Sequence, residues 1–128
     1  MIDHLGIAVR DHAASLAFYQ RALAPLGIGV LMSVPKSQSG GPSDYTGFGA
    51  DGKPFFWIGE GTLASGMHVC FTAGDRDSVD RFYKEALAAG ASDNGPPGIR
   101  AHYHPNYYGA FVIDVNGVNL EAVCHASA

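Results

Sequence analysis

The fold is decided by residues 3–26, DHLGIAVRDHAASLAFYQRALAPL, which align without a gap with residues 67–90, MHVCFTAGDRDSVDRFYKEALAAG. The offset between the two stretches is 64 residues, half of the 128-residue chain. Chance would give only about one or two identities in such a window, so a duplicated unit is the better explanation. The identical pairs are His4 and His68, Asp11 and Asp75, Phe18-Tyr19 and Phe82-Tyr83, and Ala22-Leu23-Ala24 and Ala86-Leu87-Ala88.

Each copy predicts a strand followed by a helix. Short apolar runs at residues 2–9 and 67–73 predict the strands. Asp11 and Asp75 follow these runs and are predicted to be helix N-caps, because a carboxylate there accepts a free backbone N–H of the first turn. Apolar side chains then recur at three- and four-residue spacing, until Gly27 and Gly90 end the predicted helices.

Three further strands are predicted after each helix. In the first copy they are residues 28–34 and a hairpin of 45–49 with 55–58, turned at Asp51-Gly52. The second copy has a weaker strand at 91–94, a loop at 95–108, and a hairpin of 109–114 with 118–124. Asn116-Gly117 favours a type I′ turn there. The Ser-, Gly- and Pro-rich loop 35–43 is interpreted as a mobile lid.

Both copies therefore predict the order β-α-β-β-β, which is an α+β fold. We expect a single domain over residues 1–128, with unit one at about 1–60 and unit two at about 66–125. Apolar residues make up 47% of the chain and charged residues 16%, as in a globular protein. The net charge of -4 argues against nucleic acid as a partner, because nucleic-acid binding depends on Lys and Arg.

Membrane and export signals are not recognisable in the sequence. No run approaches the 18–20 apolar residues of a membrane span, and the N-terminus lacks a basic region followed by an apolar one. Cys70 and Cys124 lie in strand-like runs without CxxC spacing, and are expected to be reduced thiols. These features predict a cytoplasmic protein without a membrane partner.

Glu121 is the anomalous residue of the last predicted strand. It lies within Leu-Glu-Ala-Val-Cys, where every neighbour is apolar. Burying an unpaired charge is costly, so the carboxylate must face solvent, find a partner or bind a metal.

Three motifs carry a resemblance to a known family. They are Ile2-Asp3-His4-Leu5-Gly6-Ile7-Ala8-Val9, Met67-His68-Val69-Cys70-Phe71 and Asp114-x-x-Gly117-x-x-Leu120-Glu121. With these motifs on a duplicated β-α-β-β-β unit, the chain resembles the vicinal oxygen chelate superfamily. That superfamily includes glyoxalase I, bleomycin-resistance proteins, fosfomycin-resistance enzymes, methylmalonyl-CoA epimerase and extradiol dioxygenases. Val115 departs from the Pro that this family often has. The resemblance implies a curved, half-open mixed sheet around a metal or ligand cleft, and a homodimer whose site lies within one chain or across two.

The resemblance also implies a metal site formed by His4, His68 and Glu121. Two imidazoles and a carboxylate leave coordination positions open for substrate, as in non-haem iron(II) oxygenases and catalytic zinc sites. The implied cofactor is a divalent metal ion, Fe²⁺, Zn²⁺, Mn²⁺ or Ni²⁺. The counterpart of Glu121 in the first copy is Trp57 at the offset of 64, or Phe56 if the hairpin turns are aligned. Neither side chain can ligate a metal.

The loop His102-Tyr103-His104-Pro105-Asn106-Tyr107-Tyr108 supplies the catalytic candidates. His104 and Tyr107 are the better candidates for proton transfer, because a His titrates near neutral pH and a Tyr can donate to a developing oxyanion. The competing interpretation is a structural loop whose tyrosines pack with their hydroxyls in water. The candidates for substrate binding are Trp57, Arg100, His102 and Tyr103. The competing interpretations are core packing for Trp57 and a solvated side chain for Arg100.

Two functions remain open. The first is a metal-dependent enzyme that chelates a small substrate through two neighbouring oxygens, like an extradiol dioxygenase or a lyase of glyoxalase type. The second is a metal-free protein that binds a bleomycin-type antibiotic, with which the negative charge and Trp57 are compatible. That alternative leaves His4, His68 and Glu121 unexplained.

Overall fold

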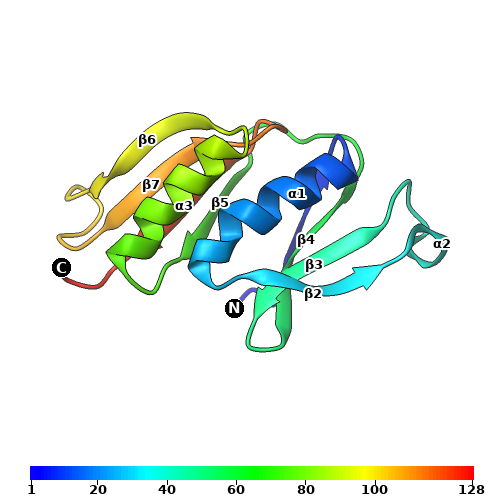
Figure 1. The fold of residues 1–128 in the computed structure, drawn as a ribbon, viewed down its shortest axis with the longest axis horizontal. Coiled ribbons are helices and arrows are strands. Elements are labelled where there is room, and N and C mark those ends of the chain that lie inside the picture. The colour runs from blue at the N-terminus through cyan, green and yellow to red at the C-terminus, as the bar shows by residue number, and fades with distance from the viewer.

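A computed structural model describes all residues 1–128 and confirms a duplicated α+β architecture (Figure 1). Unit one consists of β1 (Leu5–Val9), α1 (His12–Leu23), the 3₁₀ turn η1 (Ala24–Leu26), β2 (Gly29–Val34), the helical turn α2 (Lys36–Ser39), β3 (Tyr45–Ala50) and β4 (Lys53–Glu60). Unit two consists of β5 (His68–Thr72), α3 (Arg76–Ala88), β6 (Ser92–Ile99), β7 (Tyr108–Ile113) and β8 (Asn119–Cys124).

The two long helices begin at the predicted acidic caps. The Asp11 carboxylate accepts a hydrogen bond from the Ala14 backbone N–H at 3.0 Å, and Asp75 accepts one from Ser78 at 2.8 Å. Each bond satisfies a donor that has no partner within the helix. The repeat in the sequence is therefore also a repeat in local structure.

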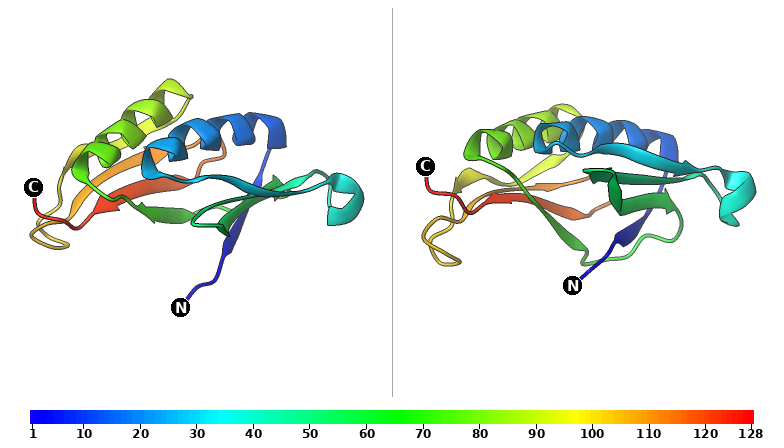
Figure 2. Two further views of the ribbon diagram at one scale, coloured as in Figure 1. Left: turned by 60° about the horizontal axis from the view of Figure 1, so that its bottom comes forward. Right: turned by 90° about the horizontal axis from the view of Figure 1, so that it is seen from below.

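The strands form two sheets of four with the same internal order. The orders are β1-β4-β3-β2 and β5-β8-β7-β6, and in each sheet the first pair is parallel and the others antiparallel. Helices α1 and α3 lie next to each other on the same side of both sheets (Figures 1 and 2). The opposite side of the sheets carries no helix, and we call it the open face.

The core lies between the helices and the sheets. Phe48 and Phe56 of unit one are 0% and 1% exposed and belong to this core. In β5, Val69 and Phe71 are buried towards the helices, whereas the alternating residues His68, Cys70 and Thr72 are exposed. Strand alternation thus places His68 on the open face.

The hairpin turn of unit two joins the two units. The Tyr19 hydroxyl of α1 donates to the buried Asp114 carboxylate. The Asn116 side chain accepts from the Arg10 backbone N–H at 2.8 Å and donates to the Ser15 hydroxyl at 3.1 Å. These contacts fix the end of β1 and the start of α1 against the last hairpin.

The predicted type I′ turn at Asn116-Gly117 is wrong, although the hairpin is present. Gly117 has φ +85°, but Asn116 is not among the residues with positive φ. The Gly117 N–H donates to the Asp114 carbonyl at 3.1 Å, which makes a three-residue loop with a left-handed glycine at its end. Asp114 selects this form because its carboxylate accepts the backbone N–H groups of Asn116 and Val118. At Asp51-Gly52, by contrast, φ is +53° and +76°, so that predicted turn is confirmed.

Two loop predictions also differ from the structure. The predicted loop 95–108 is too long, because β6 continues to Ile99 and pairs with β7 through a Gly- and Pro-rich segment whose register shifts. The predicted lid 35–43 contains the turn α2, fixed by the Lys36 N–H bond to Asp44 and the Ser39 hydroxyl bond to the Ser43 carbonyl. None of the helices is long and apolar enough to cross a membrane.

Candidate functional site

The centre of the candidate site is a contact between His68 and Glu121 on neighbouring strands of the second sheet. His68 Nε2 lies 2.9 Å from Glu121 Oε1, and the Glu121 side chain is 2% exposed. Because an ionised carboxylate only accepts, His68 donates its Nε2 proton in this bond. The carboxylate that looked anomalous in the sequence therefore has a partner, and that partner is its predicted companion at the site.

Tyr107 is the second partner of Glu121. Its hydroxyl donates to Oε2, the carboxylate oxygen that His68 does not contact. Burial raises the pKa of Tyr107, and the hydrogen bond to Glu121 raises it further, so the phenol keeps its proton at neutral pH. Gly109 makes room for this contact, since a Cβ there would lie 3.2 Å from the Tyr107 ring and 3.4 Å from Glu121 Oε2.

Cys70 lies beside this pair on the open face. It is directly opposite Glu121 in the parallel pairing of β5 with β8. Burial raises the pKa of the Cys70 thiol to about 12, and the neighbouring Glu121 carboxylate adds to the shift because it disfavours a second negative charge. Cys70 and Cys124 are both free thiols, which agrees with the expectation from the sequence.

The structure does not bring His4 to this cluster. His4 lies just before β1 in the other sheet, is exposed, and has its Nδ1 2.7 Å from the Asp3 carboxylate. No group of three or more His, Cys, Asp or Glu side chains within the chain is placed to hold a metal ion. One chain thus joins two of the three predicted ligands.

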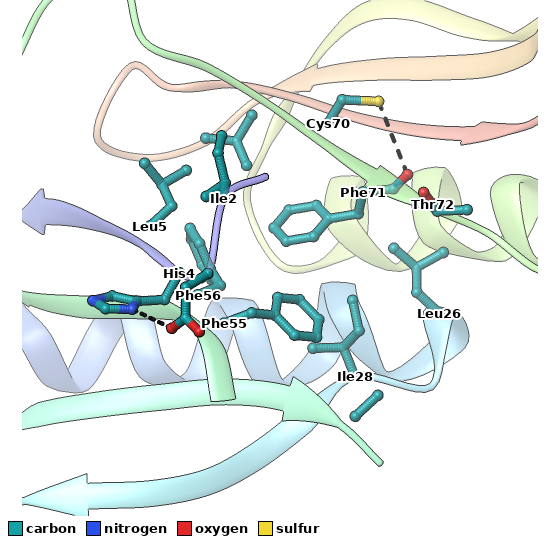
Figure 3. Close-up of a pocket in the computed structure, with 13 residues that line it drawn as sticks. Ile2, His4, Leu5, Leu26, Ile28, Phe55, Phe56, Cys70, Phe71 and Thr72 are labelled. Carbon is teal, nitrogen blue, oxygen red and sulfur yellow. Dashed lines mark hydrogen bonds and ion pairs between the residues drawn. The ribbon is translucent and has the colours of Figure 1, made fainter. Parts of the chain in front are cut away.

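A cavity of about 440 Å³ lies between the two sheets, at the seam between the start of β1 and β5. His4 and Cys70 line it from different units, as Figure 3 shows. Most of its other lining is apolar, including Phe55, Phe56 and Phe71. The cavity separates the His4 segment from the strand that carries His68.

The strand register identifies the counterpart of Glu121 in unit one. Glu121 is opposite Cys70, two residues after His68, and Trp57 is opposite Gly6, two residues after His4. Trp57 is therefore the equivalent residue, and Phe56 instead belongs to the buried core. Trp57 is half-buried on the open face and faces the same side as Gly6.

The other predicted residues of the 102–108 loop form an aromatic chain that leads outward from Tyr107. Ring centroids of Tyr103 and Tyr107 are 5.0 Å apart, and those of His102 and Tyr103 are 4.1 Å apart. His104 instead faces His125 near the C-terminus, and its Nδ1 accepts the Asn106 backbone N–H at 3.1 Å. Of the two predicted catalytic residues, only Tyr107 touches the His68–Glu121 pair.

Arg100 and Glu60 are bound within their own units. The Arg100 guanidinium donates to the carbonyls of Gly98 and Pro96 at 2.9 and 2.7 Å and stacks over Phe111. Glu60 accepts the His12 backbone N–H at 2.9 Å at the start of α1. Both side chains thus hold backbone in place, and Arg100 has three further donor positions for a ligand.

Tyr45 was missed by sequence reasoning. Its ring lies on the open face next to Trp57, at the edge of two shallow hollows. Tyr45 is directly opposite Gly59 in the register that pairs Thr46 with Ile58, and this cross-strand glycine was the signal available in the sequence.

Comparison with known proteins identifies a matching family and similar structures. A family model described as the glyoxalase/bleomycin resistance protein/dioxygenase superfamily matches residues 1–122. Among curated protein sequences, none matches the chain. A glyoxalase/bleomycin resistance protein from Albidiferax ferrireducens T118 is similar over 97% of this chain and 98% of its own, with 25% identity and a TM-score of 0.77.

Two more distant structures share the fold. A variant of the fosfomycin resistance protein FosX from Listeria monocytogenes, in complex with Mn(II) and a dihydroxypropylphosphonic acid, has 18% identity and a TM-score of 0.68. The alignment covers 96% of this chain and 88% of that protein. A glyoxalase I variant from Zea mays has 18% identity and a TM-score of 0.69, covering 95% of this chain but 46% of that longer one.

Proposed function

Because the chain belongs to the glyoxalase/bleomycin resistance protein/dioxygenase superfamily, we propose that it is a metal-dependent enzyme that acts as a homodimer. Its divalent metal is held by His68 and Glu121 of one subunit and by His4 of the second. The observation that carries the proposal is the contact of His68 with a carboxylate that is 2% exposed. A buried carboxylate next to an imidazole, at the edge of an open face, is a ready pair of metal ligands.

The second subunit is needed because one chain has too few ligands in one place. His4 lies on the first sheet, and within one chain no group of three His, Cys, Asp or Glu side chains is placed to hold a metal ion. A two-fold symmetric dimer would supply the third ligand. An isologous contact that brings His4 of one subunit to His68 and Glu121 of the other does so at two equivalent places. Each dimer then has two equivalent sites.

The bound metal would act as a Lewis acid towards two neighbouring oxygens of a small substrate. To become a ligand through Nε2, His68 would have to carry its ring proton on Nδ1 instead of donating it to Glu121. Tyr107 holds Glu121 Oε2 and orients the carboxylate. Its raised pKa keeps the hydroxyl protonated, and to donate to a substrate oxygen that gains negative charge this single O–H would have to turn from Glu121 to the substrate.

The reaction class is an oxidation or a lyase reaction of a chelated substrate. Three ligands leave room for a bidentate substrate and a further small ligand, which suits a dioxygenase of extradiol type. A lyase of glyoxalase type is the next candidate, although Trp57 stands where a fourth ligand would be. The FosX structure contains Mn(II), so Mn²⁺ is a suitable first ion for metal titrations.

A metal-free binding protein is the second candidate function. The observation that favours it is the aromatic surface of the first sheet, where Trp57 and Tyr45 lie side by side on a net acidic protein. In this case the contact of His68 with Glu121 would serve only the packing of the second sheet.

Metal analysis separates the two functions. Protein purified without chelator is expected to carry about one divalent metal per subunit. His68→Ala should lose this metal, whereas His102→Ala, a change of the same residue type on the exposed loop, should retain it. A metal-free wild type that also fails to take up Mn²⁺ or Fe²⁺ on titration would refute the enzyme proposal and favour the binding protein.

A further inference from the structure

His4 carries its ring proton on the nitrogen that faces Asp3. His4 Nδ1 lies 2.7 Å from Asp3 Oδ1 (Figure 3), and an ionised carboxylate can only accept a hydrogen bond, so Nδ1 is the donor. In the neutral ring the other nitrogen, Nε2, then has no proton and keeps its lone pair. Because Nε2 makes no hydrogen bond within the chain, this lone pair is available to a metal ion.

Asp3 is held in turn by Lys53, the first residue of β4. Lys53 Nζ donates to the same carboxylate oxygen, Asp3 Oδ1, at 2.8 Å. Strands β1 and β4 pair in parallel, so the segment just before β1 lies next to the start of β4. The contact with Lys53 therefore restrains the Asp3 carboxylate beside the His4 ring.

The repeat shows that the strand itself does not require this arrangement. The equivalent of Asp3 in unit two is Met67, which precedes His68. Strand β5 thus begins without a carboxylate before its histidine. His68 instead donates from Nε2 to Glu121, so the two equivalent histidines carry their ring protons on opposite nitrogens.

We propose that Asp3 is a positioning residue of the metal site, which fixes the ring proton of His4 on Nδ1 and thereby presents Nε2 to the metal. The proposal rests on the proposed function, in which His4 is a metal ligand. Histidine ligands donate their other N–H to a carboxylate, a carbonyl or water, which orients the ring and raises its basicity. Asp3 supplies such a carboxylate from the adjacent position in the sequence.

A surface ion pair is the competing explanation. The side chains of His4, Asp3 and Lys53 are 60%, 68% and 55% exposed in one chain. Ion pairs with this exposure contribute little to stability. If the contact did no more than this, replacement of Asp3 would leave the affinity for metal unchanged.

Nitrogen-15 NMR of the metal-free protein locates the ring proton directly. At pH 8 a histidine ring is largely neutral, and the His4 signals are assigned by their absence from the spectrum of His4→Ala. We expect wild-type His4 to be protonated on Nδ1, and to lose this preference in Asp3→Ala. Asp77→Ala is the matched control, because it removes the same charge and a surface ion pair with Arg81, at 2.9 Å, and should leave His4 unchanged.

Calorimetric titration with Mn²⁺ measures the consequence for the site. Asp3→Ala should bind Mn²⁺ about tenfold more weakly than the wild type or worse, as expected for the loss of a partner that orients a ligand. Asp77→Ala should keep the wild-type affinity. Asp3→Asn retains an oxygen that can accept the bond from Nδ1, so it should keep the position of the proton and recover part of the affinity.

The outcomes separate this inference from the proposed function. A wild-type His4 with its proton on Nε2, equal Mn²⁺ affinities of the wild type and Asp3→Ala, or equal losses in Asp3→Ala and Asp77→Ala would overturn the inference and leave a metal-binding protein in place. A wild type that takes up neither Mn²⁺ nor Fe²⁺ would refute the proposed function, and with it any role of Asp3 towards a metal.

Discussion

His68 and Glu121 approach to 2.9 Å on adjacent strands, and Glu121 is 2% exposed although it lies on the side of the sheet without helices. The Tyr107 hydroxyl donates a hydrogen bond to the other oxygen of this carboxylate. A carboxylate that accepts two hydrogen bonds and is almost excluded from water is held in one orientation. A metal ligand needs such a fixed orientation. The same arrangement makes Glu121 sensitive to substitution.

Glu121→Gln should weaken Mn²⁺ binding more than about a hundredfold, because it removes a charged ligand while the shape of the side chain is retained. Isothermal titration calorimetry measures this. Glu85→Gln is the matched control: Glu85 pairs with Arg21 on the surface, at 2.6 Å, and takes no part in the site. Equal losses of affinity in the two variants would show that overall charge, rather than ligation, governs the binding.

Cys70 should resist alkylation at neutral pH. Its pKa is raised from 9.0 to about 12 by burial and by Glu121, so at pH 8 the reactive thiolate is about a thousandfold scarcer than in an unperturbed cysteine. Removing the charge of Glu121 lowers this pKa, and iodoacetamide labelling of Cys70 in Glu121→Gln should be faster. Mass spectrometry of tryptic peptides follows both rates. Rapid labelling of Cys70 in the wild type would contradict the raised pKa of the thiol.

Tyr19→Phe should lower the free energy of unfolding by about 1.5–3 kcal/mol, since it removes a buried hydrogen bond to the Asp114 carboxylate. Urea denaturation measures the change. The repeat provides the control, because Tyr83 is the equivalent residue and donates to Asp93 at the surface, at 3.0 Å. Tyr83→Phe should leave stability nearly unchanged, and similar losses in both variants would refute a special role of the buried bond.

The parts of the fold that were predictable are those with local or repeated signals. Asp11 and Asp75 could be identified as caps because a cap interacts with the next turn of its own helix. The turn at Asp51-Gly52 was likewise a local preference. The end of β6 was not predictable, since Pro96 and Gly98 disfavour a strand and only pairing with β7 holds them there.

The contact of His68 with Glu121 could be anticipated from the sequence, but the geometry around it could not. The repeat indicated His4 and His68, and the motif at the end of the chain indicated Glu121. The bond from Tyr107 to Glu121 joins a loop to a strand fourteen positions away, and no local pattern specifies it. The bonds of the Asn116 side chain to Arg10 and Ser15 likewise join positions about a hundred residues apart in sequence, and no local pattern specifies them.

The most direct test of the account mixes two inactive subunits. His4→Ala and His68→Ala homodimers should each lack a complete site and bind no metal tightly. Unfolded together in equal amounts and refolded, they form mixed dimers in which one site has lost both histidines and the other is intact. About a quarter of the wild-type metal should be recovered after mixing. Full metal in His4→Ala alone, or no recovery after mixing of correctly refolded dimers, would contradict a site shared between two subunits.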